Sequence, residues 1–144
     1  MDPCETIGSD IAARIEAVDW SAVNGELDDF GVGRLGPILT RDECKSLKAL
    51  YAEPSLFRSR IVMARHGFGQ GEYQYFAYPL PGLIKALREA VYPSAARTAN
   101  RWAGMMGTDK RYPEQLEKML ERCHAAGQKR PTPLMLKYGP GDYN

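Results

Sequence analysis

The 144-residue sequence contains few of the side chains that most often build metal sites and nucleophilic sites. It has only two histidines, His66 and His124, and neither belongs to an H-x-D or H-x-x-x-H pattern. Without such a spacing, a metal site assembled from these two histidines is the less favoured interpretation, and we expect none. No G-x-S-x-G motif is present, and the adjacent Cys123 and His124 would leave a helix about 100° apart, which does not suit a nucleophile–base pair. We therefore predict that no residue of this chain is catalytic unaided.

Cysteines, export signals and long apolar runs are scarce as well. Cys4, Cys44 and Cys123 have no metal-type spacing, and an odd number of cysteines without an export signal indicates reduced thiols. Cys44 and Cys123 occupy apolar positions of expected helices, so we predict both in the core. The amino terminus has no basic and apolar leader, and no run approaches the roughly 20 apolar residues of a membrane span. These absences predict a cytoplasmic protein without a membrane partner.

The composition is that of a globular domain with an uneven charge distribution. Hydrophobic residues make up 44% and charged residues 26% of the chain, which is enough for a packed core. Residues 1–80 carry eight basic and twelve acidic side chains, whereas residues 81–130 carry ten basic and five acidic ones. The second segment is therefore either a solvated helical surface or a contact for an anionic partner. We expect one domain, with helix, strand and hairpin in 1–80, helices in 81–130, and a strand and turn in 131–144.

The first helix is expected after Ser9 or Asp10, either of which can cap it. Its apolar positions include Ile11 and Ile15, one turn apart, and Trp20 should pin the helix to the rest of the domain.

A turn, a strand and a capped helix are predicted next. Residues 21–31 are polar, and their Asp28-Asp29 pair is interpreted as loop solvation, since adjacent carboxylates do not have metal spacing. Residues 32–39 are expected to form a short irregular strand. Thr40-Arg-Asp-Glu43 matches a capping box and should begin a helix that Pro54 ends.

A long antiparallel hairpin is predicted from residues 60–65 and 72–78, joined by the glycine-rich turn 66–71. The turn spells G-x-G-x-G, but no helix follows it to cradle a phosphate, so we reject a nucleotide site. The hairpin concentrates polar-tipped side chains, which makes it the best candidate for substrate contacts. The alternative is a half-exposed aromatic sheet face. The candidate substrate-binding residues are Arg65, His66, Tyr73 and Tyr75.

Residues 81–130 are predicted to form three helices. The first should end at Tyr92-Pro93, Ser94 should cap the second, and Pro113 should open the third. Gly127 is expected just past the end of the third helix, where a left-handed backbone conformation is common.

The last thirteen residues have a strand pattern followed by a sharp turn. Leu134, Leu136 and Tyr138 alternate with Met135 and Lys137, which is typical of a half-buried strand. Gly139-Pro-Gly-Asp142 then favours a turn, and Tyr143 follows it.

Lys137-Tyr138, Gly141 and Tyr143 resemble the strand that enters the active site of Fe(II)/2-oxoglutarate-dependent dioxygenases, especially their prolyl-4-hydroxylase-like bacterial branch. In that family the strand leads into an H-x-D motif, which supplies two ligands of the facial triad that binds iron. The resemblance places this motif roughly three residues beyond Asn144. It implies that Tyr138 and Tyr143 bind the cofactor, with Tyr138 bonding 2-oxoglutarate and Tyr143 lining the pocket. The alternative is two amphipathic rings at a sheet edge.

The resemblance also implies a fold and an activity. The fold would be α+β, with amphipathic helices supporting a few antiparallel strands at the start of a double-stranded β-helix, or jelly-roll, oxygenase. The activity would couple 2-oxoglutarate decarboxylation to hydroxylation of an unknown small-molecule or peptide substrate. Because the iron ligands would lie beyond residue 144, we expect the chain alone to be inactive and to self-associate through its open sheet edge.

The alternative function is a helical binding module whose basic 81–130 surface contacts nucleic acid. No helix-turn-helix or RNA-binding signature accompanies the basic residues, and Glu114, Glu117 and Glu121 interrupt them. Binding that falls steeply with salt would favour this module.

Overall fold

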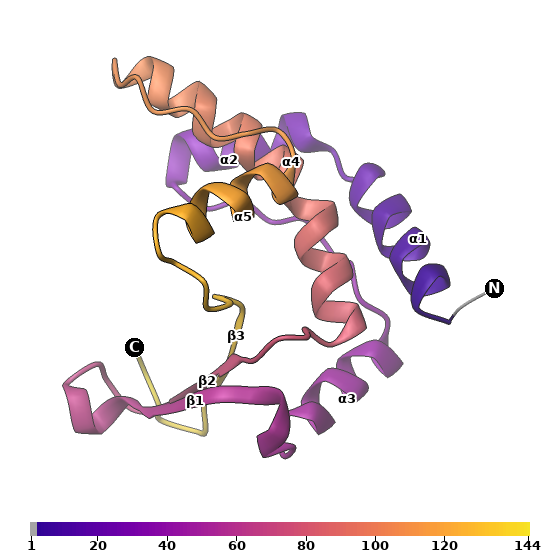
Figure 1. The fold of residues 1–144 in the computed structure, drawn as a ribbon, viewed down its shortest axis with the longest axis vertical. Coiled ribbons are helices and arrows are strands. Elements are labelled where there is room, and N and C mark those ends of the chain that lie inside the picture. The colour runs from indigo at the N-terminus through magenta and orange to yellow at the C-terminus, as the bar shows by residue number, and fades with distance from the viewer. Residues whose placement is uncertain (1–2) are drawn as a thin grey trace. The chain divides into compact units, whose positions relative to one another are not determined.

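The computed structural model describes residues 3–144, with side chains described from Asp10 onward. It combines helices with a three-stranded antiparallel sheet, so the predicted α+β class is confirmed (Figure 1). The chain forms two compact units. The helical unit consists of the residues up to Leu39 and Gly82–Lys129, and the sheet unit consists of Thr40–Pro81 and Arg130–Asn144. None of the helices in the described part is long and apolar enough to cross a membrane.

The helical unit packs α1 (Pro3–Glu16) against α4 (Gly82–Met105). Its buried centre consists of Ile11, Ile15 and Ala86. Trp20 packs against this centre, and its indole Nε1 donates to the Ile15 carbonyl at 3.0 Å. The predicted anchoring role of Trp20 is therefore confirmed. Further partly buried side chains surround the centre, namely Leu35, Ile38, Leu39, Leu83, Leu87, Ala90 and Val91.

The start of α1 and the segment after it differ from the prediction. Ser9 and Asp10 lie inside α1, which begins at Pro3, so neither caps it. The expected turn at residues 21–31 is instead α2 (Trp20–Phe30). Asp19 caps this helix by accepting a hydrogen bond from the Ala22 amide at 3.1 Å, and burial of Val23 holds one face of it. Tertiary packing outweighs the polar composition here.

Residues 32–39, all of them described, form no regular element and pair with no strand, so the predicted strand is wrong. Gly33 lies against α2, where an added Cβ would come 2.9 Å from the Val23 carbonyl oxygen. Gly36 has a positive φ of 82°, which interrupts a regular strand. The apolar pattern of this segment reflects packing on the helical core instead.

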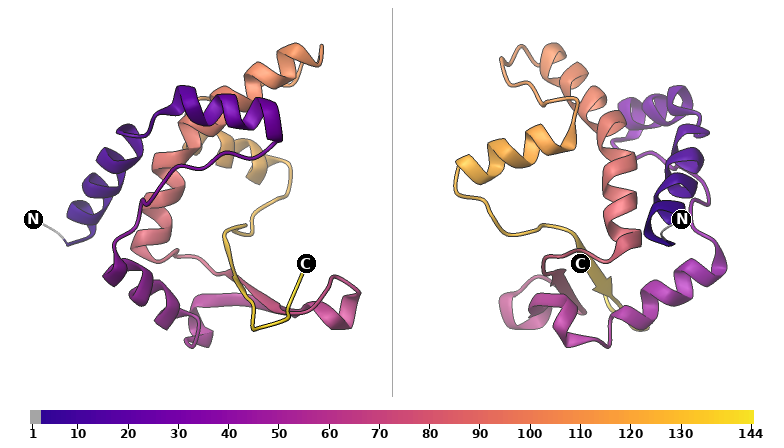
Figure 2. Two further views of the ribbon diagram at one scale, coloured as in Figure 1. Left: turned by 180° about the vertical axis from the view of Figure 1, so that it is seen from behind. Right: turned by 45° about the vertical axis from the view of Figure 1, so that its right-hand side comes forward.

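α4 continues without a break through Pro93, which contradicts the predicted division at Tyr92-Pro93 (Figure 2). Proline removes one backbone donor, but the packing around it offsets this loss. The Tyr92 hydroxyl donates to the Pro113 carbonyl at 2.7 Å. Ser94 is buried inside the helix, so it does not cap a second helix as predicted.

The last helix, α5 (Leu116–Ala125), starts three residues later than Pro113 and ends as predicted. Gly127 has a φ of 90°, and the amides of Gly127 and Gln128 donate to the carbonyls of His124 and Cys123 at 3.0 and 2.8 Å. These two backbone hydrogen bonds together form a Schellman motif. Cys123 is only partly buried and Cys44 is exposed, so the prediction of two core cysteines is wrong.

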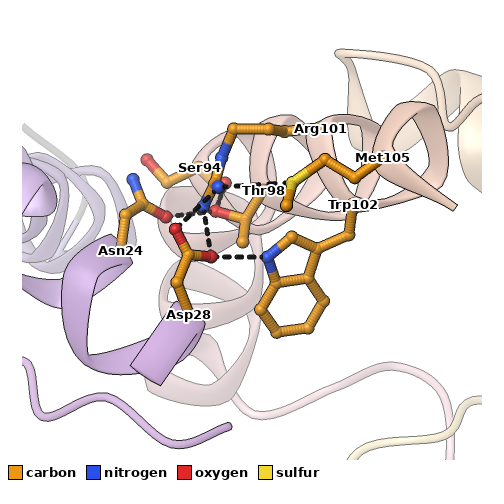
Figure 3. A network of polar contacts seen from close by, with 7 residues as sticks. All are labelled: Asn24, Asp28, Ser94, Thr98, Arg101, Trp102 and Met105. Carbon is orange, nitrogen blue, oxygen red and sulfur yellow. Dashed lines mark hydrogen bonds and ion pairs between the residues drawn. The ribbon is translucent and has the colours of Figure 1, made fainter. Parts of the chain in front are cut away.

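Asp28 joins α2 to α4 inside the helical unit, contrary to the expected solvated loop (Figure 3). Both terminal nitrogens of Arg101 donate to its carboxylate, at 2.8 and 2.9 Å, and Trp102 Nε1 donates at 2.7 Å. One turn away, the Thr98 hydroxyl donates to Asn24 Oδ1 at 2.7 Å. The hydrogen bonds from Arg101 and Trp102 lower the pKa of Asp28 below its usual value, since they favour the charged form.

The sheet unit begins with α3 (Arg41–Leu50), and its predicted capping box is confirmed. The Thr40 hydroxyl accepts from the Glu43 amide at 3.2 Å, and the Thr40 amide donates to the Glu43 carboxylate at 2.7 Å. The helix ends at Leu50, before Pro54, which opens the short 3-10 helix η1 (Pro54–Leu56).

The three strands have the order β1-β2-β3 and are antiparallel to their neighbours. They are β1 (Phe57–Val62), β2 (Glu72–Phe76) and β3 (Leu134–Lys137). The predicted hairpin and the predicted last strand are confirmed, although β1 stops at Val62 and is followed by the 3-10 helix η2 (Met63–His66). β2 is the central strand, and its Phe76 is fully buried.

Candidate functional site

One face of the sheet gathers the tyrosines that the sequence singled out. The register pairs Tyr73 with Leu136 and Tyr75 with Leu134 across β2 and β3. Because side chains alternate along a strand, Tyr138 falls on this same face. Its ring lies 2.8 Å from where a Cβ on Gly71 would be, two residues before Tyr73. We call this surface, made of Tyr73, Tyr75, Leu134, Leu136 and Tyr138, the tyrosine face.

The tyrosine face is apolar and aromatic, with one cation beside it. The rings of Tyr73 and Tyr75 meet edge to face with centroids 5.7 Å apart. The Arg58 guanidinium lies 4.4 Å from the centre of the Tyr75 ring, and its Nε donates to the Pro131 carbonyl at 3.0 Å. Tyr138 is 44% exposed. Apolar side chains with a few polar tips and a fixed cation suit a small ligand that carries an anionic group.

The glycine-rich turn between β1 and β2 is bonded to the last residues of the chain. The Gln70 amide donates to the Tyr143 carbonyl at 2.7 Å, and the Tyr143 amide donates to the Gln70 carbonyl at 3.0 Å. Gly69, at a φ of 113°, has its Cβ position only 2.2 Å from the Tyr143 carbonyl oxygen. The G-x-G-x-G pattern therefore permits close backbone approach between this turn and Tyr143.

The turn Gly139–Asp142 brings Tyr143 to this position. The Asp142 amide donates to the Gly139 carbonyl at 3.1 Å, and the Gly139 amide donates to the Asp142 carboxylate at 2.7 Å. Pro140 followed by Gly141, which has a φ of 85°, gives a type II turn. The predicted turn is confirmed.

The candidate residues thus fall into two groups within the sheet unit. Tyr73, Tyr75 and Tyr138 share the tyrosine face. Arg65 and His66 lie in η2 and are exposed, close in sequence to Gln70, which pairs with Tyr143. The roles of these residues in binding substrate and cofactor stay predictions.

The opposite face of the sheet and α3 line a groove of about 960 Å³ that sequence reasoning missed. Its apolar lining includes Leu47, Phe57 and Met135, and charged side chains stand among them. Its residues come from three separate segments, so no local pattern reveals it. A useful signal is the period-two alternation of Glu72 and Gln74 with the tyrosines of β2.

Polar contacts organise this groove. Glu72 forms an ion pair with Arg60, and Lys137 Nζ lies 3.9 Å from the same carboxylate. The hydrogen bond from Arg60 lowers the pKa of Glu72, whereas burial, followed by the negative charge of Glu72, raises the pKa of Tyr51. Gln74 donates to the Tyr51 carbonyl at 3.0 Å. The buried Tyr51 hydroxyl has no hydrogen-bond partner among the described residues.

The described residues do not form a metal centre, because nowhere among them do three His, Cys, Asp or Glu side chains gather closely enough to hold an ion. Iron therefore does not fit this set of residues alone. The tyrosine face offers the phenol of Tyr138 as a hydrogen-bond donor, and Arg58 stands over Tyr75, which pairs with Leu134 four residues before Tyr138.

Comparison with known proteins gives the family. Residues 71–144 match the Oxygenase-NA family, described as an oxygenase catalysing oxidative methylation of damaged DNA. Two curated proteins of Mycobacterium tuberculosis, the uncharacterized proteins MT2286 and Rv2227, are each 44% identical over 69 residues, which is 48% of this chain and 30% of each relative. The chain thus spans under a third of their length. No solved structure matches significantly. Because the family match covers more than half of the chain, including β2, β3 and the terminal turn, the chain belongs to the Oxygenase-NA family of oxygenases.

Proposed function

We propose that this chain contributes the cosubstrate-binding strand and supporting helices of an Fe(II)- and 2-oxoglutarate-dependent oxygenase that acts on damaged DNA. The observation that carries the proposal is the family match over residues 71–144. The position of Tyr138 on an apolar, aromatic sheet face supports it, because a phenol donor in such surroundings suits a carboxylate.

The chain's own residues have separate tasks in this proposal. Tyr138 donates a hydrogen bond that orients 2-oxoglutarate, and Leu134 and Leu136 keep water from its carbon chain. Tyr143 lines the pocket, and the hairpin residues contact the substrate. When bound, iron and 2-oxoglutarate supply oxygen activation, decarboxylation to succinate and oxidation of a substrate C–H bond. The resemblance assigns the iron ligands to an H-x-D segment after Asn144, and the three strands would then begin a jelly-roll core.

The family match does not favour a separate helical nucleic-acid module. Several of its basic side chains already have partners within the helical unit: Arg101 binds Asp28, and Arg97 donates to the Ser94 hydroxyl at 2.9 Å. Arg111 and Arg122 donate to backbone carbonyls. These contacts give the basic residues a structural role.

The protein encoded by the complete reading frame provides the test. It should form succinate from 2-oxoglutarate only with Fe(II), and faster with an oligonucleotide treated with a methylating agent than with an untreated one. Tyr138→Phe should raise the KM for 2-oxoglutarate severalfold without changing the melting temperature, because it removes one donor from an exposed position. Tyr112→Phe, which alters an exposed tyrosine of the helical unit, is the matched control.

Two results would contradict the proposal. One is an unchanged cosubstrate requirement in Tyr138→Phe. The other comes from anaerobic calorimetric titration of the 144-residue chain with Fe(II), together with light scattering. We expect no tight iron binding and a self-associated chain, so a monomer that binds one iron tightly would place the metal site elsewhere.

A further inference from the structure

The hairpin tip, residues 63–71, carries an exposed aromatic ring together with one arginine and one histidine. Phe68 is 52% exposed, whereas Phe76 in the adjoining strand is fully buried. The tip contains Arg65 and His66 and no acidic residue. A second exposed aromatic, Tyr143, pairs through its backbone with Gln70. The tip therefore offers apolar aromatic surface beside positive charge.

The backbone of the tip is held in place. Met63 is buried and its amide donates to the Gly71 carbonyl at 3.0 Å, while the Phe68 amide donates to the Met63 carbonyl at 3.1 Å. The ring of His66 stacks on Phe68, with centroids 5.4 Å apart and planes 22° apart. An exposed ring with this support is preorganised for contact.

Exposed apolar side chains are common on proteins, so exposure alone identifies no partner. Phe30 illustrates the point, because it is 76% exposed but follows Asp28 and Asp29 directly in the chain. Arg101 already pairs with Asp28, but Asp29 leaves a negative charge next to Phe30 in the chain, which disfavours a polyanion. The tip combines an exposed ring with a basic residue and an aromatic support, and apolar side chains such as Phe are what DNA-bending proteins insert between base steps.

The tip also adjoins the tyrosine face. Gly71 ends the tip, and the Tyr138 ring contacts the position of its Cβ at 2.8 Å. Chemistry on a base within a duplex requires that the base leaves the stack. A protein side chain that fills the gap left in the base stack would keep the base outside the duplex. Close to the tyrosine face, it would keep that base near the cosubstrate.

We propose that Phe68 is a wedge that inserts into the base stack of duplex DNA, with His66 supporting its ring and Arg65 contacting a phosphate. This inference rests on the proposed function. It assigns the opening of the duplex to the hairpin tip and makes Phe68 a positioning residue.

The test uses the same full-length protein and a duplex oligonucleotide that contains 2-aminopurine, whose fluorescence rises when it leaves the stack. Fluorescence anisotropy of a dye on the other strand reports binding separately. At saturating wild-type protein we expect a severalfold rise in 2-aminopurine fluorescence. Phe68→Ala should bind the duplex with less than about tenfold weaker affinity and lose most of the rise, since phosphate contacts supply most non-specific affinity. Phe68→Trp should keep the rise in 2-aminopurine fluorescence, and Phe30→Ala should show the same rise as the wild type.

The outcomes separate the two proposals. A full fluorescence rise by duplex-bound Phe68→Ala overturns the wedge and leaves the proposed function standing. Absence of DNA binding by the wild type overturns the proposed function together with the wedge. Circular dichroism verifies folding, and Phe68→Gln replaces Phe68→Ala if the alanine variant is unfolded.

Discussion

Gly69→Ala should open the contact between the hairpin tip and the last residues. The φ of 113° at Gly69 disfavours any side chain, at a cost of about 1–3 kcal/mol. The new Cβ would also lie 2.2 Å from the Tyr143 carbonyl oxygen, so the bridge between Gln70 and Tyr143 must separate. Loss of its two backbone hydrogen bonds adds about 1–3 kcal/mol. The expected total is about 2–6 kcal/mol, with local opening as the cheaper response.

Gly67→Ala is the matched control for this substitution. Gly67 has a φ of 69°, and within the described part of the chain no atom lies within 4 Å of its Cβ position. Its substitution should therefore cost only the backbone strain of about 1–2 kcal/mol. Denaturant unfolding measures both costs, and hydrogen exchange at the amides of Gln70 and Tyr143 reports the bridge. Equal destabilisation by the two variants, with undiminished amide protection in Gly69→Ala, would refute the steric reasoning.

Three further perturbations probe the two units. Asp28→Asn should destabilise the chain at neutral pH. Since the folded pKa of Asp28 is depressed, its stabilisation is present above the usual value of 3.8 and is lost as the pH falls through the folded value. The melting curves of the variant and the wild type should therefore differ at neutral pH and coincide only in strong acid. Tyr51 has a raised pKa, so its contribution to stability is present below pH 10 and is lost as the pH rises further. The melting temperature of Tyr51→Phe should therefore fall less at alkaline pH than that of the wild type. An equal fall would mean that Tyr51 does not cause the alkaline loss of stability. Phe76→Ala should cost about 3–5 kcal/mol in denaturant unfolding because it empties a fully buried site stacked on Phe57, and a cost under about 1 kcal/mol would mean that the core lies elsewhere.

Local signals in the sequence predicted the elements that local interactions determine. The capping box of Thr40 and Glu43, the hairpin, the terminal strand and the turn at Gly139–Asp142 each involve residues close in the chain or a strict alternation. These features need no knowledge of distant partners. The positions of Tyr73, Tyr75 and Tyr138 on one face follow from the same alternation once the register is known.

Features that depend on distant partners could not be read in this way. Asp28 looks like a loop residue until Arg101 and Trp102, more than seventy residues later, approach it. Pro93 is a helix breaker by local rules, yet α4 passes through it because the helix packs on both sides of it. The groove between α3 and the sheet is assembled from three segments, and the turn that carries Phe68 is bonded to Tyr143 near the other end of the chain.

The interleaving of the two units has a consequence for the order of folding. Each unit is built from two separate chain segments, so the chain passes between the units at residues 39–40, 81–82 and 129–130. Strand β3 meets β2 only after a loop of more than fifty residues has closed, whereas β1 and β2 are joined by a short turn. Loop-closure entropy makes the longer closure costlier by about 1–2 kcal/mol, so the hairpin should form first and wait for β3. Nascent chains would then leave the β3-pairing edge of β2 open until residues 134–137 have been synthesised, which makes that edge a natural target for chaperones during translation.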